Sequence, residues 1–173
     1  MIRAIKYKAD IINDVSGFSY EGQSLLKLKK YNIVKVLHHM QGTPNTMQKS
    51  PKYKNVLLDI YDFFEKGIKE IKNKKIIIDP GIGFGKNLKH NLTLISKISL
   101  FHSLGLPILI GTSRKRFISQ ISGDNDSEER IGGTIASVLF LLSQGVQIFR
   151  VHDVNEVKQS ILVFEKILSN FKN

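Results

Sequence analysis

The stretch IIIDPGIGFGKN, residues Ile76–Asn87, joins a run of β-branched residues to a carboxylate and a glycine-rich loop. Three consecutive isoleucines predict a short buried strand, because β-branched side chains favour extended backbone. Asp79 ends that strand, and Pro80 after it has no N–H group to donate. The three glycines that follow at alternate positions allow positive φ and a close approach of backbone to a ligand. The stretch therefore predicts a strand that delivers one carboxylate to the edge of a site.

Strands and helices alternate along the rest of the chain. Short stretches rich in Ile and Val predict strands at residues 9–13, 33–40, 75–79, 107–111 and 146–151. Helical spacing of apolar residues predicts helices at residues 21–31, 57–71, 90–104, 128–143 and 157–171. This order indicates a parallel sheet with crossover helices, in an open doubly wound sheet or as part of a (β/α)₈ barrel. Both architectures bind ligands at the carboxyl ends of the strands.

Composition narrows the class of protein. The chain has 173 residues, 42% of them hydrophobic and none of them cysteine, so we expect one domain without disulfides or thiolate–metal sites. The formal net charge is +11, but lysines scattered along the chain carry most of it, which argues against a nucleic-acid partner. The sequence shows no signal-peptide pattern and no apolar run of membrane-spanning length, so we expect a cytoplasmic protein without a membrane partner.

Every other predicted strand also ends in polar groups. They are Asn13-Asp14, His38-His39-Met40-Gln41-Gly42, Thr112-Ser113-Arg114-Lys115-Arg116 and Arg150-Val151-His152-Asp153. Arg150 and His152 are two residues apart on a strand and so share a face, which favours an anion site, although a structural pair bonded to Asp153 is the alternative. At least one cation of Thr112–Arg116 is expected to touch the ligand. Asp79 would accept from a planar edge with two adjacent N–H groups, unless it is an ordinary turn aspartate.

Other kinds of site fit less well. The glycines follow Gly-x-Gly-x-Gly, which is not the dinucleotide fingerprint or a Walker A loop. His38 and His39 are adjacent on a strand and point opposite ways, so they do not form a zinc site. We expect each to be a buried or turn-stabilising histidine.

Five segments together resemble dihydropteroate synthase, a pterin-binding family. They are Ile11–Gly17, His39–Gln48, Ile76–Asn87, Gly111–Ile118 and Arg150–Val154, in the family's order and spacing. The resemblance covers essentially the whole chain. It implies a (β/α)₈ TIM barrel of the pterin-binding type, with residues 1–173 as a single domain of about five βα units, strands 4 to 8. The implied reaction condenses 6-hydroxymethyl-7,8-dihydropterin diphosphate with p-aminobenzoate to give 7,8-dihydropteroate and diphosphate.

The resemblance also implies residue roles. The pterin-binding positions are Asn13, Met40, Asp79, Lys115 and Arg150. Arg150 and His152 match the diphosphate-binding pair, and Phe84, Lys115 and Arg116 match the p-aminobenzoate pocket. Asp79, Lys115, Arg150 and His152 are the expected catalytic residues. The partners implied are these small-molecule substrates and a second copy in a homodimer.

The chain departs from the family's pattern at its front. The family's first strand carries an asparagine that holds Mg²⁺, and its third strand carries a second pterin-binding carboxylate; neither has a counterpart here. We therefore expect an incomplete barrel, Mg²⁺ as a cofactor without a metal ligand in this chain, and weak or no turnover by the chain alone. The alternatives are a non-catalytic remnant that binds pterin or a partner chain, and a pterin-dependent methyltransferase barrel.

Overall fold

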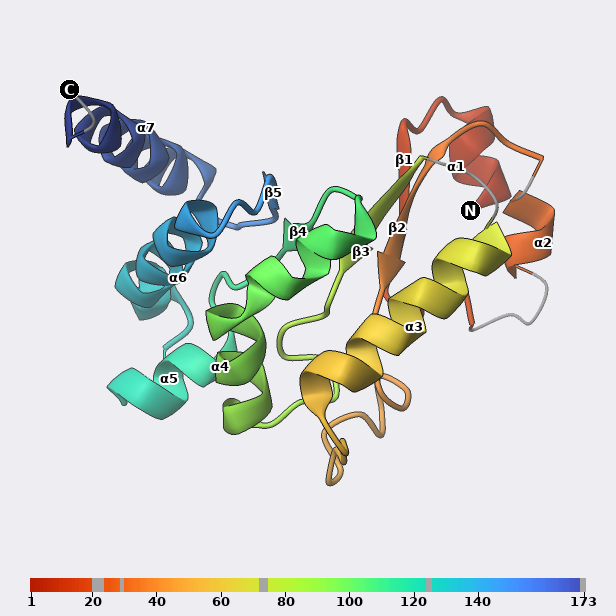
Figure 1. Ribbon diagram of the computed structural model, residues 1–173, viewed down its shortest axis with the longest axis horizontal. Coiled ribbons are helices and arrows are strands. Elements are labelled where there is room, and N and C mark those ends of the chain that lie inside the picture. The colour runs from red at the N-terminus through yellow and green to blue at the C-terminus, as the bar shows by residue number, and fades with distance from the viewer. Residues whose placement is uncertain (20–23, 29, 72–74, 124–125, 172–173) are drawn as a thin grey trace.

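A computed structural model describes residues 1–19, 24–28, 30–71, 75–123 and 126–171 of the chain. The strands are β1 (Ile11–Asp14), β2 (Val34–His38), β3 (Ile76–Asp79), β4 (Leu109–Ile110) and β5 (Ile148–Phe149). The α-helices are α1 (Ile2–Lys6), α2 (Ser24–Leu28), α3 (Val56–Ile71), α4 (Leu88–Ser96), α5 (Arg116–Ser122), α6 (Ile131–Ser143) and α7 (Val154–Phe171). Two 3₁₀ helices, η1 (Ile98–Leu104) and η2 (Glu128–Arg130), complete the set (Figure 1).

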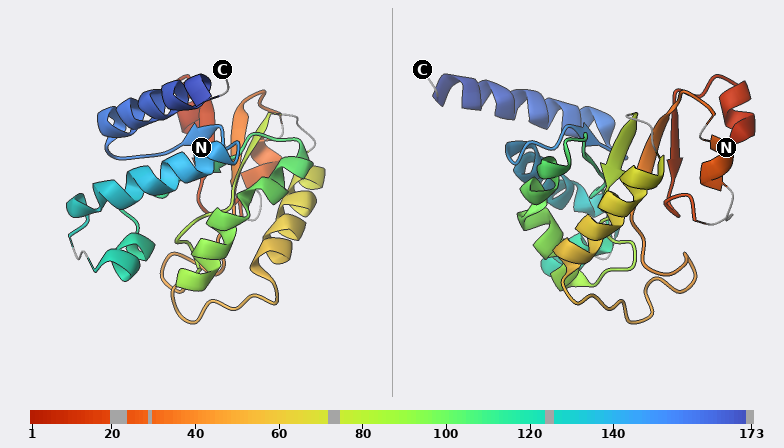
Figure 2. Two further views of the ribbon diagram at one scale, coloured as in Figure 1. Left: turned by 60° about the vertical axis from the view of Figure 1, so that its left-hand side comes forward. Right: turned by 45° about the vertical axis from the view of Figure 1, so that its right-hand side comes forward.

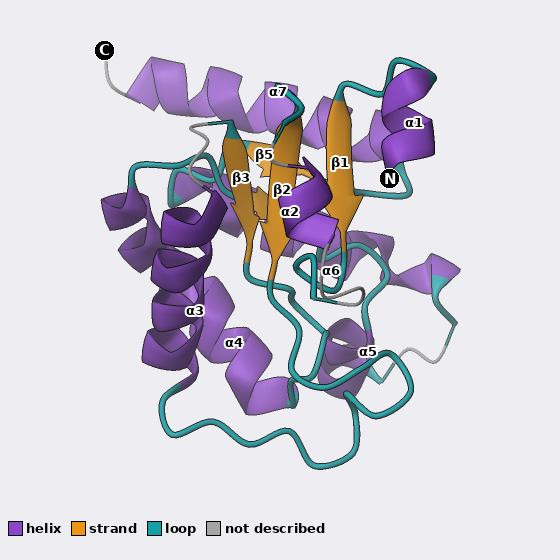
Figure 3. Ribbon diagram, turned by 90° about the vertical axis from the view of Figure 1, so that its right-hand side faces the viewer, coloured by secondary structure: helices purple, strands orange, loops and turns teal. Residues whose placement is uncertain are grey.

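The described strands all run parallel. β1, β2 and β3 form one sheet in that order, and β4 pairs with β5. A single parallel bridge between Ile78 and Ile108 links β3 to β4. Figure 3 shows β1, β2 and β3 side by side, with their carboxyl ends directed towards the same group of loops. The α/β class predicted from the sequence is confirmed, while the assignment to strands 4 to 8 of an eight-stranded barrel stays a prediction.

The outer face of the strands packs against helices. Phe64 on α3 and Phe101 on η1 are fully buried, and their rings meet edge to face with centroids 5.7 Å apart. They join Ile76 and Ile78 of β3 and Ile110 of β4 in one apolar cluster. Truncating such an aromatic side chain costs about 3–5 kcal/mol in typical cores. This layer fixes the positions of the strands.

The face of the strands opposite these helices, the inner face, changes from apolar to polar along each strand. Val36, Ile77 and Leu109 form a small apolar cluster there, with Ile148 packed against it. Side chains alternate between faces, so the residue two positions later on each strand shares this face. Those residues are His38 after Val36, Asp79 after Ile77 and Arg150 after Ile148. The inner face is therefore apolar at its centre and polar at its carboxyl rim.

The last helix projects from the body of the protein (Figures 1 and 2). Helix α7 packs on α6, and Val157 is the side chain of α7 that is buried among the described residues. Its apolar residues Leu162, Val163, Ile167 and Phe171 are each more than half exposed. At the opposite side, Ile11 of β1 is 49% exposed. Apolar side chains are therefore exposed on α7 and on the edge strand β1.

The predicted elements and the observed ones differ in several places. The predicted helix 90–104 is two pieces, α4 and η1, and the predicted helix 128–143 is η2 followed by α6. Helices α1 and α5 were not expected. Strand β2 ends at His38, two residues earlier than predicted. The predicted helix 21–31 falls partly outside the described residues, and α2 occupies its middle.

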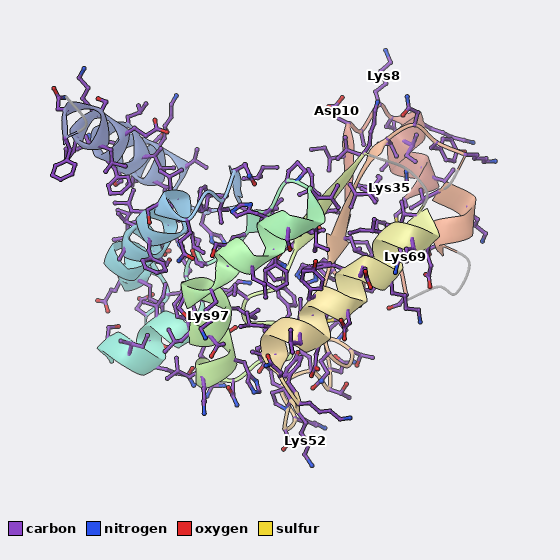
Figure 4. All side chains as sticks on the ribbon, viewed as in Figure 1. Lys8, Asp10, Lys35, Lys52, Lys69 and Lys97 are labelled. Atoms are coloured by element: carbon purple, nitrogen blue, oxygen red, sulfur yellow. The ribbon has the colours of Figure 1, made fainter. Side chains whose placement is uncertain are left out.

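Charge is spread over the molecule. The labelled lysines of Figure 4 lie on different elements, with Lys69 on α3, Lys97 beside η1, and Lys8 and Lys52 at opposite ends of the view. Among the described residues, no helix is both long enough and apolar enough to cross a membrane.

Candidate active site

Asp79 lies at the end of β3 with 1% of its surface exposed. Its Oδ1 accepts a hydrogen bond of 2.8 Å from the backbone N–H of Gly81. Its Oδ2 lies 3.5 Å from Nη2 of Arg150 and 3.9 Å from Nε2 of His38. A buried carboxylate needs such donors and opposite charges to remain ionised. Among the described residues, Oδ2 accepts only the long hydrogen bond from Arg150, so it retains the capacity to accept another.

The loop after Asp79 has most of its carbonyl groups bonded. Phe84 N–H donates to Gly81 O over 3.0 Å, and Gln48 Nε2 donates to Gly83 O over 2.7 Å. The hydroxyl of Tyr53 donates to Gly85 O over 2.8 Å. Gln48 and Tyr53 both belong to the segment after β2. Hydrogen bonds from another loop therefore hold the glycine-rich loop in one conformation, although it contains three glycines.

Lys115 reaches the same loop from the other side. Its Nζ donates to the carbonyl of Ile82 and lies 4.5 Å from the centre of the Phe84 ring. Burial lowers the pKa of Lys115 to about 8, although the carboxylate of Asp79 acts in the opposite direction. The ammonium group thus sits between a carbonyl and an aromatic face, close to a buried carboxylate.

Lys86 and His39 form a buried pair behind the loop. Lys86 Nζ donates to Nδ1 of His39 over 3.0 Å and to the carbonyl of Phe84 over 2.9 Å. Burial lowers the pKa of His39 to about 2, so its ring is neutral and accepts the hydrogen bond. The backbone N–H of His39 also donates to the backbone carbonyl oxygen of Asp79 over 2.9 Å. This pair connects the end of β2 to the end of β3.

Burial also lowers the pKa of Lys86 to about 7, from an ordinary value of 10.5. Between these two values the unfolded chain binds more protons than the folded chain, so the free energy of unfolding rises with pH. We expect Lys86→Met to remove part of this rise, on the order of 1 kcal/mol per pH unit between pH 7 and 9. Urea unfolding at pH 7, 8 and 9 measures both slopes. Equal slopes for the two proteins would show that Lys86 keeps its proton.

Two pairs join the strand ends of β4 and β5. Ser113 Oγ lies 3.0 Å from Nδ1 of His152 and accepts from its backbone N–H over 3.2 Å. Arg114 donates to both carboxylate oxygens of Asp153, at 3.1 and 2.5 Å, which raises the pKa of Arg114 and lowers that of Asp153. Bidentate geometry fixes the orientation of both partners. His152 and Lys115 are consequently positioned by their neighbours in the chain.

Comparisons with known proteins identify the family. The model of a protein family described as "Pterin binding enzyme" matches residues 1–152 of the chain. Dihydropteroate synthase of Escherichia coli K12 is 39% identical over 173 residues, which cover 97% of this chain and 61% of the relative.

The chain belongs to the pterin binding enzyme family. Dihydropteroate synthase of Stenotrophomonas maltophilia, solved with active site-bound imidazole, superposes with a TM-score of 0.91 at 33% identity, over 95% of this chain and 63% of that one. The enzyme of Thermus thermophilus has been solved in complex with 6HMPPP and with 4-aminobenzoate, and each structure gives a TM-score of 0.88. The structure with 6HMPPP is 33% identical, and the match covers 95% of this chain and 67% of that one. The structure with 4-aminobenzoate is 34% identical, and the match covers 94% of this chain and 65% of that one. The chain thus spans about three fifths of the length of the curated relative it matches.

Within this family, the structure places most of the expected site residues on one rim. Asp79 and Arg150 are in contact, and Lys115 lies over Phe84. A cavity of about 390 Å³ beside them is lined by Phe84, Lys115 and Arg116, together with Gln48 and Asn91. His152 lies on the same rim, where it contacts Ser113.

Two expected residues have no contact with this group among the contacts described. Asn13 is exposed on β1, and its Cα pairs with that of Val36 on β2, so it shares the inner face with Val36. Met40 lines a separate cavity with Asp14, Ser16 and Thr43. The prediction had extended strand β2 to Met40, but β2 ends at His38 and the chain turns away through Gly42, whose φ is +80°.

Sequence reasoning missed the residues that hold the site together. Lys86 looked like one of many surface lysines, yet 3% of it is exposed. Gln48 and Tyr53 gave no signal, because their hydrogen bonds to the glycine-rich loop join segments about thirty residues apart. Asn87 carried a recognisable helix-start pattern, and its side chain accepts from His90 N over 2.8 Å at the start of α4.

Proposed function

We propose that this chain carries the pterin and p-aminobenzoate sites of a dihydropteroate synthase. The reaction condenses 6-hydroxymethyl-7,8-dihydropterin diphosphate with p-aminobenzoate in folate biosynthesis. The single observation that carries the proposal is the buried carboxylate of Asp79, with Oδ2 open to a donor and the cations Arg150 and Lys115 beside it. The names of the relatives, and the 6HMPPP and 4-aminobenzoate in the Thermus thermophilus structures, support it.

The pterin is assigned to the inner face at Asp79. An ionised carboxylate accepts strongly from adjacent N–H donors, and the amino-pyrimidinone edge of a pterin presents two of them. The guanidinium of Arg150 lies 3.5 Å from Oδ2 and is 41% exposed, so a ring that binds Asp79 would meet Arg150. Asn13 and Met40 are proposed as further pterin contacts on the strength of the family resemblance alone.

The p-aminobenzoate is assigned to the cavity of about 390 Å³ beside the pterin position. Phe84 offers an aromatic face to the arene, and the cations Lys115 and Arg116 line the same cavity, where they suit a carboxylate. Lys115 reaches both substrates, because it contacts the loop next to Asp79 and lines this cavity.

The chemistry follows from charge placement. The arylamine nitrogen forms a bond to the pterin methylene carbon, the carbon–oxygen bond to diphosphate breaks, and the amine loses a proton. Arg150 and His152 are proposed to stabilise the departing diphosphate, and Asp79 the electron-poor pterin. Preorganised charges of this kind, with reactants held side by side, lower the barrier.

Magnesium is proposed from the resemblance. Among the described residues, no three His, Cys, Asp or Glu side chains are grouped so that they could hold a metal ion. The described residues therefore offer no such metal cluster, and the steps above do not pass through a metal.

A homodimer is proposed from the family resemblance, and a cytoplasmic location from the absence of cysteine in the sequence. An apolar hollow between α4 and α6, lined by Leu88, Leu92, Ile95 and Phe140, supports self-association. Leu92 is 40% and Phe140 47% exposed. Burying such side chains against a second copy would be favourable.

An assay with both substrates tests the proposed function. We expect the 173-residue chain to bind the pterin diphosphate and to form dihydropteroate slowly, because it spans 61% of the Escherichia coli relative. Chromatographic detection of dihydropteroate, with omission of p-aminobenzoate as the control, measures product. Calorimetry with the pterin diphosphate measures binding separately. The absence of any pterin binding would contradict the proposal, whereas binding without product would leave the chain as a pterin-binding protein and not an enzyme.

A further inference from the structure

His38 is a fully buried histidine at the end of β2, level with Asp79 on the neighbouring strand. Its Nδ1 lies 2.8 Å from the carbonyl oxygen of Val15. A carbonyl oxygen only accepts, so Nδ1 carries the proton and Nε2 of the neutral ring has a free lone pair. Among the described residues, no group donates a hydrogen bond to Nε2.

Nε2 faces a second acceptor. It lies 3.9 Å from Oδ2 of Asp79, whose other oxygen already accepts from Gly81. Burial lowers the pKa of His38 more than Asp79 raises it, and the charges of Lys86 and Lys115 lower it further. The ring is therefore neutral at pH 7. Two buried acceptors then face each other: Oδ2 has the long 3.5 Å hydrogen bond from Arg150, and Nε2 has no donor among the described residues. Buried acceptors in folded proteins are normally paired, so this arrangement points to a donor that arrives with the ligand.

The ring of His38 is also fixed in place. It meets the Phe84 ring edge to face with centroids 4.6 Å apart, and its Nδ1 is held by Val15. Arg150, a long side chain that is 41% exposed, reaches Oδ2 of Asp79 over 3.5 Å. A planar ligand that displaced Arg150 would meet both acceptors in a preset geometry.

We propose that His38 is a specificity-determining residue of the pterin site. Its Nε2 and the Oδ2 of Asp79 together accept the two adjacent N–H donors, ring amide and exocyclic amine, of an amino-pyrimidinone edge. This inference rests on the proposed function and deepens it. It assigns a ligand-reading role to a histidine that the sequence analysis expected to be structural, and it selects for ligands with two neighbouring donors.

The first test compares ligands and variants. Calorimetry would measure binding of 6-hydroxymethylpterin and of two analogues, one without the exocyclic amine and one methylated at the ring amide. The wild-type chain, His38→Leu and His38→Gln are compared. We expect the wild type to prefer the parent pterin about tenfold or more over each analogue. His38→Leu should lose most of the preference against at least one analogue, and His38→Gln, whose side-chain oxygen still accepts, should retain part of it.

Two results would overturn the inference in distinguishable ways. If His38→Leu discriminates as well as the wild type, His38 does not read the ligand, although the proposed function stands. If the wild type binds none of the three pterins, the proposed function and this inference both fail.

A second measurement needs no substitution. Nitrogen-15 NMR of the histidine rings of the wild-type chain reports which ring nitrogen is protonated. We expect His38 to show the Nδ1–H tautomer at pH 7, and its Nε2 resonance to move towards the hydrogen-bonded value as 6-hydroxymethylpterin is added. An Nε2–H tautomer, or an Nε2 resonance that stays unchanged at saturating pterin, would contradict the inference.

Discussion

Gly81→Ala is expected to destabilise the chain by at least about 2 kcal/mol more than a matched glycine substitution, and to abolish pterin binding. Gly81 has a φ of +69°, and a Cβ built on it would lie 2.0 Å from the carbonyl oxygen of His39. That oxygen is backbone at the end of β2, so the loop has to move. Because Gly81 N–H holds Oδ1 of Asp79, the carboxylate would move with it.

Gly105→Ala is the matched control. Gly105 has nearly the same φ, +67°, but nothing lies within 4 Å of the position of its Cβ. It should therefore show only the strain of a left-handed alanine, about 1–2 kcal/mol. Urea unfolding of both variants separates the clash from the strain. Equal stability of the two variants, with unchanged pterin affinity for Gly81→Ala, would show that the two loops are not in the contact described.

Asp79→Asn is expected to weaken binding of 6-hydroxymethylpterin by roughly 10- to 100-fold, the cost of losing charge-assisted hydrogen bonds. The substitution keeps the shape of the side chain and an oxygen that can accept from Gly81. However, it removes the negative charge that faces Arg150 and Lys115, and its amide can present N–H groups to a ligand that donates. Calorimetric titration with the pterin measures the change, and urea unfolding checks that the variant is folded.

Asp62→Asn removes the same charge from the exposed side of α3 and serves as the control. It should change pterin affinity by less than about twofold, since an exposed charge in water is well screened. If Asp62→Asn and Asp79→Asn weaken binding equally, net charge and not a specific carboxylate governs affinity.

The sequence predicted the strand ends better than the site they build. Each stretch rich in Ile and Val was a strand, and the polar residues after it lay at the rim. Strand alternation is a local rule, and the order of strands and helices indicates parallel pairing. Those rules placed Asp79, Arg150 and Lys115 near one another. They failed for Met40, since a strand that ends two residues early carries its next side chains elsewhere.

The missing information concerned contacts between loops. Lys86 is buried because His39 and Phe84 receive its hydrogen bonds, and nothing near Lys86 in the sequence shows this. Likewise His38 and His39 were expected to be equivalent structural residues. They differ because alternation turns His38 to the inner face beside Asp79, while His39 accepts from Lys86 behind the loop. Which of two adjacent histidines meets a ligand depends on tertiary packing.

An amide-resolved NMR titration of the 173-residue chain with 6-hydroxymethylpterin distinguishes a pterin site at the carboxyl rim around Asp79 from binding elsewhere on the chain. We predict saturable shifts confined to the loop from Gly81 to Gly85, to the end of β2, and to Lys115 and Arg150, with helix α7 unaffected. The absence of saturable shifts, or shifts confined to α7 or to the hollow between α4 and α6, would contradict a pterin site at this rim.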